Sequence, residues 1–214
     1  MEVEVIVARE EHMPHAVKIS SLMEEASKVR GTGIAKRSVH YLQQKMKEGK
    51  AVIALRKNEI VGFCYIETWS HGKYVANSGL IVHPDFRNTG LAKKIKIKIF
   101  RLSQKKYPKA KIFGITTSLA VMKINSALGY RPVTFSELTT DEQFWKGCKS
   151  CKNYDILTRT ERKHCLCTGM LYDGEAKPAL IETSTSTAKI RKLQKVKKFF
   201  RRMKTGMKRK AVKV

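Results

Sequence analysis

The chain of 214 residues has few acidic side chains and no long apolar run. It carries 18 Asp and Glu against 44 Lys and Arg, which gives a formal net charge of +26. No stretch approaches the roughly 18 apolar residues that a membrane-spanning helix needs. The acidic start of the chain also lacks the basic and then apolar order of a signal peptide. We therefore expect a cytoplasmic protein with no transmembrane segment.

The positive charge is concentrated at one end. Residues 183–214 hold 13 of the 44 basic residues and no Asp or Glu, so they supply half of the net charge. Such charge predicts attraction to polyanions. Apolar residues recur there at helical spacing (Leu193, Val196, Phe200, Met203 and Met207), which predicts a basic amphipathic tail that contacts nucleic acid or an anionic membrane. The alternative is a solvated, mostly disordered tail.

The rest of the chain has the apolar content and the periodicity of a folded domain. Alternating residues predict strands at 3–7, 51–55, 60–68 and 74–82, and helical spacing predicts helices at 10–29 and 38–47. The short turns between the three later strands predict an antiparallel meander. Farther on we expect a helix at 93–100, a strand at 111–116, a helix at 117–128, and strands at 130–135 and near 167–172.

One segment between a strand and a helix has the features of a phosphate-binding loop. It reads Val82-His83-Pro84-Asp85-Phe86-Arg87-Asn88-Thr89-Gly90-Leu91-Ala92. Its two small residues let a ligand approach the backbone, and the start of the helix presents free N–H groups to an anion. The sequence therefore predicts a pyrophosphate site here. The alternative is an ordinary junction between a strand and a helix.

The same segment carries a family signature. Arg87-x-x-Gly90-x-Ala92 resembles the R/Q-x-x-G-x-G/A motif of the GCN5-related N-acetyltransferase (GNAT) superfamily. Val82-x-Pro84-x-Phe86 is similar to that family's V-x-P-x-Y/F lead-in, and Leu128-Gly129-Tyr130 to its L-G-F segment. The resemblance covers residues 1–136. It implies an α/β (α+β) fold with a central mixed, mostly antiparallel sheet flanked by helices, and it favours a helix after the loop.

The resemblance also implies an N-acyltransferase that uses acetyl-CoA or succinyl-CoA as its co-substrate. The N–H groups of the loop would hold the pyrophosphate, and they belong to Arg87, Asn88, Thr89, Gly90, Leu91 and Ala92. The backbone of Leu80, Ile81 and Val82 would pair with the pantetheine arm, and an N–H there would stabilise the oxyanion. The 3′-phosphate would meet Lys93, Lys94 and Lys96.

Two residues are candidates for the proton transfers. Glu67 ends an apolar strand, where a raised pKa would suit a general base; the alternative is a solvent-facing residue, and His71 and His83 are weaker candidates. Many family members have a tyrosine as general acid five residues before the aromatic of the L-G-F segment. Asn125 stands at that position, and its amide can only hydrogen-bond the sulfur. Water, Ser126 or Tyr107 would then protonate the thiolate, or no acid is needed.

The acceptor is expected to be a small-molecule amine. Arg30 and Arg37 flank a glycine-containing loop and are candidates to clamp a carboxylate; the alternative is a flexible basic loop. The whole chain resembles short acyltransferases of bacterial arginine synthesis. This likeness rests on the R-G-T-G-I-A-K-R-S, F-W-K-G-C-x-S-C and H-C-L-C-T-G-M-L-Y-D segments, and it implies L-glutamate as the acceptor.

Four of the five cysteines lie close together in the sequence. Cys148-x-x-Cys151 and Cys165-x-Cys167 are separated by 13 residues and resemble a structural Zn²⁺ site with four thiolate ligands. Reduced buried thiols or a redox pair are the alternatives. We expect the site to attach the surrounding segment to the acyltransferase body.

These patterns together predict an acyltransferase domain at 1–138, a Cys-rich, zinc-stabilised extension at 139–172, a linker at 173–187 and the basic tail at 188–214. The leading hypothesis is that the protein is an enzyme, a GNAT-type N-acyltransferase. The sequence is compatible with a homodimer. The second hypothesis is a non-catalytic protein of the same fold that binds RNA, the ribosome or an anionic surface through its tail and its zinc site.

Overall fold

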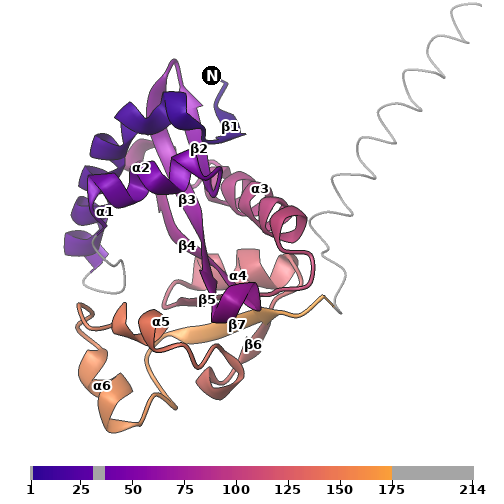
Figure 1. Cartoon of the computed structure of the whole chain (residues 1–214). Helices are drawn as coiled ribbons and strands as arrows, with labels where there is room; N and C mark the ends of the chain where they lie inside the picture. The colour runs from indigo at the N-terminus through magenta and orange to yellow at the C-terminus, as the bar shows by residue number, and fades with distance from the viewer. Residues whose placement is uncertain (1, 31–36, 175–214) are drawn as a thin grey trace, which may run out of the picture. The chain divides into compact units, whose positions relative to one another are not determined.

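The computed structural model describes residues 2–30 and 37–174, all of which belong to the compact unit Met1–Lys177 (Figure 1). β1 (Glu4–Val7) is followed by the 3₁₀ helix Glu10–His15, α1 (Ala16–Arg30) and α2 (Val39–Lys47). Ser38 caps α2, because its hydroxyl accepts a hydrogen bond from the Tyr41 N–H. The described residues contain no helix that is both long and apolar enough to cross a membrane.

A seven-stranded sheet forms the centre of the described part of the chain. Its strand order is β1-β2-β3-β4-β5-β7-β6, with β2 (Ala51–Arg56), β3 (Glu59–Trp69), β4 (Tyr74–Val82), β5 (Lys111–Thr116), β6 (Arg131–Val133) and β7 (Thr168–Tyr172). The β4–β5 pair is parallel and the other described pairs are antiparallel. The expected mixed, mostly antiparallel sheet is therefore confirmed.

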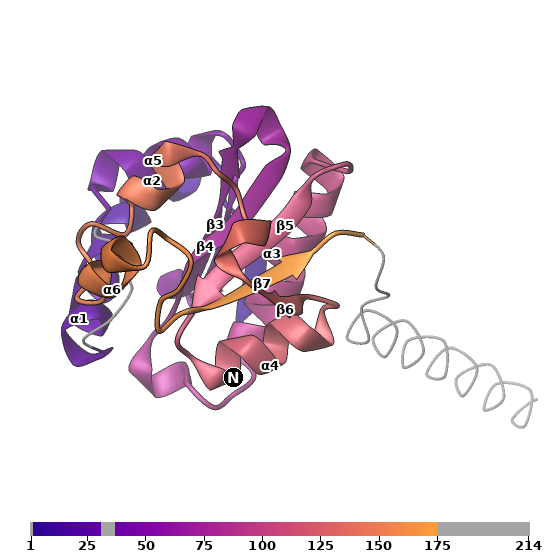
Figure 2. The ribbon, with the colours of Figure 1, turned by 90° about the horizontal axis from the view of Figure 1, so that it is seen from below.

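The helices cover both faces of this sheet. α1 and α2 lie on one side of β1–β4 and α3 (Leu91–Lys106) on the other, as Figure 1 shows. The repeated Lys-Ile alternation after the loop is helical, as expected, because Ile95, Ile99 and Phe100 then share the buried side. α4 (Leu119–Ala127) contacts α3, while α5 (Glu142–Lys146) and α6 (Tyr154–Arg159) lie toward α1 and α2 (Figure 2).

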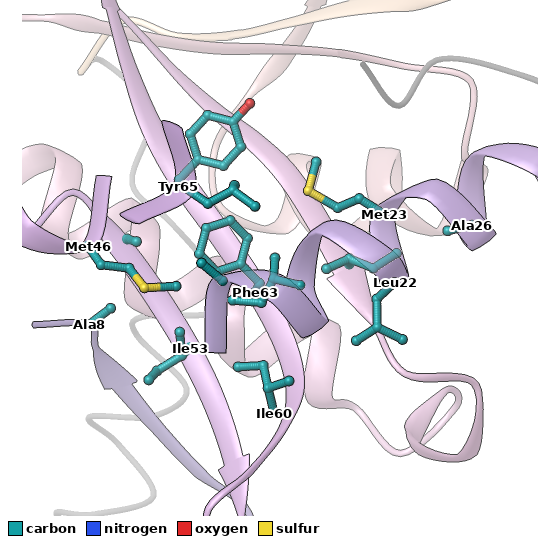
Figure 3. Close-up of a cluster of buried hydrophobic side chains, with 14 residues drawn as sticks. Ala8, Leu22, Met23, Ala26, Met46, Ile53, Ile60, Phe63 and Tyr65 are labelled. Carbon is teal, nitrogen blue, oxygen red and sulfur yellow. The ribbon is translucent and has the colours of Figure 1, made fainter. Parts of the chain in front are cut away.

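The larger hydrophobic core lies between the α1–α2 side and strands β1–β4. Figure 3 shows Phe63 and Tyr65 of β3 at its centre, with Leu22 and Met23 of α1 on one side and Met46 of α2 on the other. Phe63 and Met46 are fully buried. Burying large apolar side chains of this kind stabilises the fold by about 1.5–3 kcal/mol each, so this cluster fixes the helices to the sheet.

A second core attaches the segment after residue 134 to the other end of the sheet. Phe144 and Trp145 of α5 contact each other, and they reach Trp69 of β3, Phe113 of β5 and Phe135 through aromatic rings 5.0–5.6 Å apart. The indole N–H of Trp145 donates to the Thr139 carbonyl at 2.9 Å. Aromatic packing thus holds this segment in place.

β4 changes partners along its length, and this opens the sheet. It pairs with β5 only over Tyr74–Ala76, so its edge beyond Ala76 has no ladder to β5. On its other edge the register with β3 shifts, because Phe63 lies opposite Ile81 while Tyr65 lies opposite Ser78. Gly79 and Leu80 form the resulting bulge. Gly79 has φ +64°, and a side chain there would overlap the Tyr65 ring, so this position requires glycine.

Candidate active site

A cavity of about 260 Å³ lies where β4 and β5 separate. It is lined by the β4 bulge and the end of β3, by the second turn of α3 and the middle of α4, and by the segment of α5 and α6. It brings together residues that the sequence analysis selected separately, namely Glu67, Leu80, Asn125 and Arg37. It is therefore the candidate active site.

The predicted pyrophosphate loop lies between the end of β4 and the start of α3. Arg87 Nε donates to the Val82 carbonyl at 3.4 Å, and Thr89 Oγ1 donates to the Phe86 carbonyl at 2.7 Å. Gly90 has φ +81° and nothing within 4 Å of the place where a Cβ would stand. The first turn of α3 has no acidic residue, and Lys93 is exposed there. The free N–H groups of a helix start beside open space suit a phosphate group.

The bulged edge of β4 is the second part of the site. Ser78, Gly79 and Leu80 line the cavity, and here β4 has no ladder to β5. Ile81 and Val82 are buried and pair with Phe63 and Gly62 of β3. An extended ligand can therefore add its hydrogen bonds along the edge of β4 that β5 leaves open, as an added strand does.

Glu67 is the candidate base, and it is buried in the cavity wall with only 9% of its surface exposed. Lys45 Nζ of α2 donates to Glu67 Oε2 at 2.8 Å. Burial raises the pKa of Glu67 to about 7, while the charge of Arg37 acts in the opposite direction. The alternative of a solvent-facing residue is therefore wrong, and the carboxyl can take up a proton near neutral pH. His71 and His83 lie outside the cavity wall.

Arg37 lies beside Glu67 in the same wall. Its Nε donates to the Tyr65 hydroxyl at 2.9 Å, and its guanidinium lies 5.3 Å from the centre of the Tyr41 ring. These contacts hold a cation in the cavity wall beside Glu67. The backbone of Arg30 ends α1, and its side chain lies outside the described part of the structure.

Several polar atoms in the cavity wall lack a partner. Trp69 Nε1, Asn125 Oδ1 and Asn153 Nδ2 are buried, have no hydrogen bond within the described protein and line this cavity. A buried polar group without a partner costs about 1–3 kcal/mol. Unpaired groups gathered around one cavity can hydrogen-bond a polar ligand or ordered water there.

Comparisons with known proteins agree with this geometry. Residues 47–113 match the profile of the acetyltransferase (GNAT) family. The chain has the GNAT fold. The predicted superfamily resemblance is thereby confirmed. Among curated proteins no sequence match is found.

Three solved structures show the likeness. N-acetylglutamate synthase from Neisseria gonorrhoeae, complexed with coenzyme A and N-acetyl-glutamate, has a TM-score of 0.56 and 15% identity over 80% of this chain, which spans only 35% of that chain. Rv2747 from Mycobacterium tuberculosis, in complex with CoA, has a TM-score of 0.57 and 14% identity, covering 79% of this chain and 98% of the other. A putative acetyltransferase from Salmonella typhimurium, yncA, with its cofactor acetyl-CoA, has a TM-score of 0.56 and 10% identity, covering 82% and 96%.

The cysteine pairs of this GNAT-fold chain also meet at the cavity. All four cysteines of the two pairs are free thiols and line the cavity, namely Cys148, Cys151, Cys165 and Cys167. Burial, reinforced by the neighbouring cysteines, raises the pKa of Cys148 to about 11 and that of Cys167 to about 12. No group of three or more His, Cys, Asp or Glu in residues 2–30 and 37–174 is arranged to hold a metal ion. The predicted zinc site is therefore not supported.

The structure adds residues that the sequence analysis missed. Lys45 pairs with Glu67 although the two are 22 positions apart, and no local pattern connects them. Lys96, expected at the 3′-phosphate, is instead buried in the cavity wall. This position had a signal, since Lys96 precedes the buried Ile99 and Phe100 by three and four residues and so shares their side of the GNAT helix α3.

Proposed function

We propose that the protein is an acyl-CoA-dependent N-acyltransferase that transfers an acetyl or succinyl group to a small amine. The observation that carries this proposal is the cavity itself. It joins the open edge of β4 to Glu67, a buried carboxyl whose pKa of about 7 suits a base. The match of residues 47–113 to the acetyltransferase (GNAT) profile, and the coenzyme A complexes of the similar structures, support the choice of donor.

The donor would lie along the groups already described. The N–H groups from Arg87 to Ala92 would hold its pyrophosphate, and the open edge of β4 would pair with its pantetheine arm. The thioester would then lie at the bulge, where the Leu80 N–H is the candidate donor to the developing oxyanion. Holding both reactants in one cavity replaces an encounter in solution by a reaction between neighbours.

The chemistry then needs proton transfers. Glu67 accepts a proton from the ammonium group of the acceptor, which frees the nitrogen lone pair. The nitrogen attacks the thioester carbon, a C–N bond forms, and the carbonyl oxygen takes the negative charge. When this intermediate collapses, the C–S bond breaks and its electron pair leaves with the sulfur, which takes up a proton, while the nitrogen releases its second proton to water.

We propose L-glutamate, or a similar small amino acid, as the acceptor, which would place the enzyme in arginine biosynthesis. Arg37 supplies a cation, and the unpaired N–H groups of Trp69 and Asn153 supply donors. This set suits a carboxylate near Glu67. The structural likeness to N-acetylglutamate synthase, solved with N-acetyl-glutamate, supports the same choice.

A thiol-release assay tests both levels of the proposal. Acetyl-CoA and succinyl-CoA are each offered with glutamate, aspartate, glutamine and agmatine, an amine without a carboxylate. We expect turnover with glutamate and a large loss of kcat/KM for Arg37→Gln with that acceptor. Turnover limited to agmatine would contradict the carboxylate acceptor, and no turnover together with no coenzyme A binding would contradict the enzyme.

The proposals for partners concern parts of the chain that the structure does not describe. The linker and tail at 173–187 and 188–214 lie outside the described residues except for Asp173 and Gly174. Contact of the tail with nucleic acid or an anionic membrane, and formation of a homodimer, stay predictions. Because every residue that lines the cavity lies between positions 23 and 167, truncation after Glu182 should leave turnover unchanged.

A further inference from the structure

Lys96 is a charged side chain in an unusual place. It lies in the second turn of α3, only 2% of its surface is exposed, and it lines the cavity. Its Nζ lies 5.5 Å from the centre of the Tyr130 ring. Among the described residues no carboxylate pairs with it. A buried ammonium is rarely left without a counter-ion, because removing it from water is costly.

The titratable groups that face Lys96 do not neutralise it. A negative charge on Cys64 of β3 would raise the pKa of Lys96. However, burial raises the pKa of the Cys64 thiol to about 11, so Cys64 is neutral near pH 7. Burial also raises the pKa of Tyr130, so the phenol stays neutral as well. Tyr172, which lies beside Tyr130, is a phenol too. The protein surrounds Lys96 with uncharged groups and leaves its charge to be balanced by a ligand.

Asn125 lines the same cavity as Lys96. The Tyr130 N–H donates to the Asn125 backbone carbonyl at 3.1 Å, so the ring beneath Lys96 adjoins the end of α4. The Asn125 side chain is 2% exposed, lines the cavity, and its Oδ1 has no partner. Lys96 and the unpaired Oδ1 of Asn125 thus both line the cavity, from α3 and α4. Glu67 reaches the cavity from β3, where Lys45 of α2 pairs with it.

We propose that Lys96 is a catalytic residue that meets the departing thiolate of coenzyme A and gives it a proton. This inference rests on the proposed function. As the C–S bond breaks, its electron pair stays on sulfur, and the ammonium transfers one proton to that sulfur, so that coenzyme A leaves as a thiol. The amine of Lys96 regains a proton from water, and the acceptor nitrogen releases its second proton to water. The net products are the amide, the thiol and one proton.

Two physical arguments support this role. A thiolate formed in a low-dielectric cavity gains more from a nearby cation than it would in water. Burial also lowers the pKa of Lys96 from its usual value, which brings it closer to that of a thiol and makes the proton transfer more nearly balanced. The Nδ2 group of Asn125 can donate a hydrogen bond to the sulfur, but an amide has no acidic proton to give.

The test compares Lys96→Met with Lys98→Met. Met has a similar length without the charge, and Lys98 is an exposed lysine on the same helix. For Lys96→Met we expect kcat to fall by about 100-fold, which is the lower end of the range for a proton donor. The pKa of the bound coenzyme A thiol, followed by thiolate absorbance, should rise by about 1–3 units, because an adjacent cation lowers a thiol pKa by that much. Lys98→Met should match the wild type in both measurements.

The outcomes separate this inference from the proposed function. If the wild type turns over and Lys96→Met keeps the same kcat or the same thiol pKa, the role of Lys96 is overturned. The proposed function would stand in that case. A wild type that neither binds coenzyme A nor turns over would overturn the proposed function. Lys96→Met should fold and unfold at a temperature no lower than the wild type, because it removes an unpaired buried charge. A variant that fails to fold would show that Lys96 is structural and would also overturn the inference.

Discussion

Replacing Glu67 by Gln is the most direct test of the base. Gln keeps the shape of the side chain and can still accept a hydrogen bond from Lys45, but it cannot take a proton from the acceptor. A positioned general base contributes about 10²–10⁴-fold to a rate, so Glu67→Gln should lower kcat/KM by at least about 100-fold. Coenzyme A affinity should not change, since Glu67 lies in β3, away from the loop before α3.

The pH dependence follows from the raised pKa of Glu67, which lies near 7. The active form is the ionised carboxylate, so activity is lost as the pH falls. Below pH 7 its fraction drops about tenfold per unit, so kcat/KM at pH 6 should be roughly one tenth of its plateau above pH 8. A carboxyl with its ordinary pKa would give a flat profile over that range. Steady-state rates between pH 5.5 and 9 measure this directly.

Two variants sharpen the result. The Lys45 ammonium lies 2.8 Å from the Glu67 carboxylate and favours the ionised form of that carboxyl. Because Lys45→Met removes this charge, the midpoint of the pH profile should move to higher pH. Glu59→Gln, the same substitution at an exposed position of β3, should leave the profile unchanged. If Glu67→Gln keeps the wild-type slope below pH 7, another group sets the profile and the assignment of Glu67 as the base is wrong.

Three further predictions concern the loop, the aromatic packing and the cysteines. Gly90→Asp should abolish coenzyme A binding, measured by calorimetry, because it places a negative charge where the loop would hold the negatively charged pyrophosphate. Gly174→Asp, also at positive φ with free space, controls for backbone strain. Retained affinity in Gly90→Asp would refute the assignment of the loop as the pyrophosphate site. Trp145→Ala should lower the free energy of unfolding by about 3–5 kcal/mol in a urea titration, as for other buried aromatics, and a loss below about 1 kcal/mol would contradict the second core. A chelator should leave the melting temperature unchanged, since apolar contacts attach the Cys-rich segment; a clear drop, with zinc found by elemental analysis, would restore the metal site.

Local patterns were sufficient for most of the sheet and helices. The meander and the loop before α3 each depend on neighbouring residues, and each is found where the pattern places it. The strand expected at 130–135 is shorter, at Arg131–Val133, because the chain turns into a 3₁₀ helix at Phe135. That turn brings Phe135 onto Trp145, a contact that no alternation of residues reports.

The site was less accessible to sequence reasoning because its chemistry depends on burial and on distant partners. Glu67 was selected for its apolar neighbours, but the ion pair with Lys45 joins β3 to α2. In the sequence Lys96 is one of several cations in a basic segment. Its burial becomes evident only in the folded helix. The cysteine spacing resembles that of a zinc site, yet the described residues contain no group arranged to hold a metal ion, and the four cysteines line the cavity wall. A spacing does not report solvation, and solvation decides the charge of each of these groups.

The position of β7 has a consequence for how the molecule is made. β7 is the last strand in the sequence but lies inside the sheet, between β5 and β6, and β6 has no other partner in the described sheet. On the ribosome, the strands up to β5 can pair as they emerge, whereas β6 must wait until residue 172 has been synthesised. The segment that carries Trp145 and the cysteines must pass through the exit tunnel first. The cavity is therefore completed only at the end of synthesis of this part of the chain, and a chain that stops earlier would lack an intact cavity.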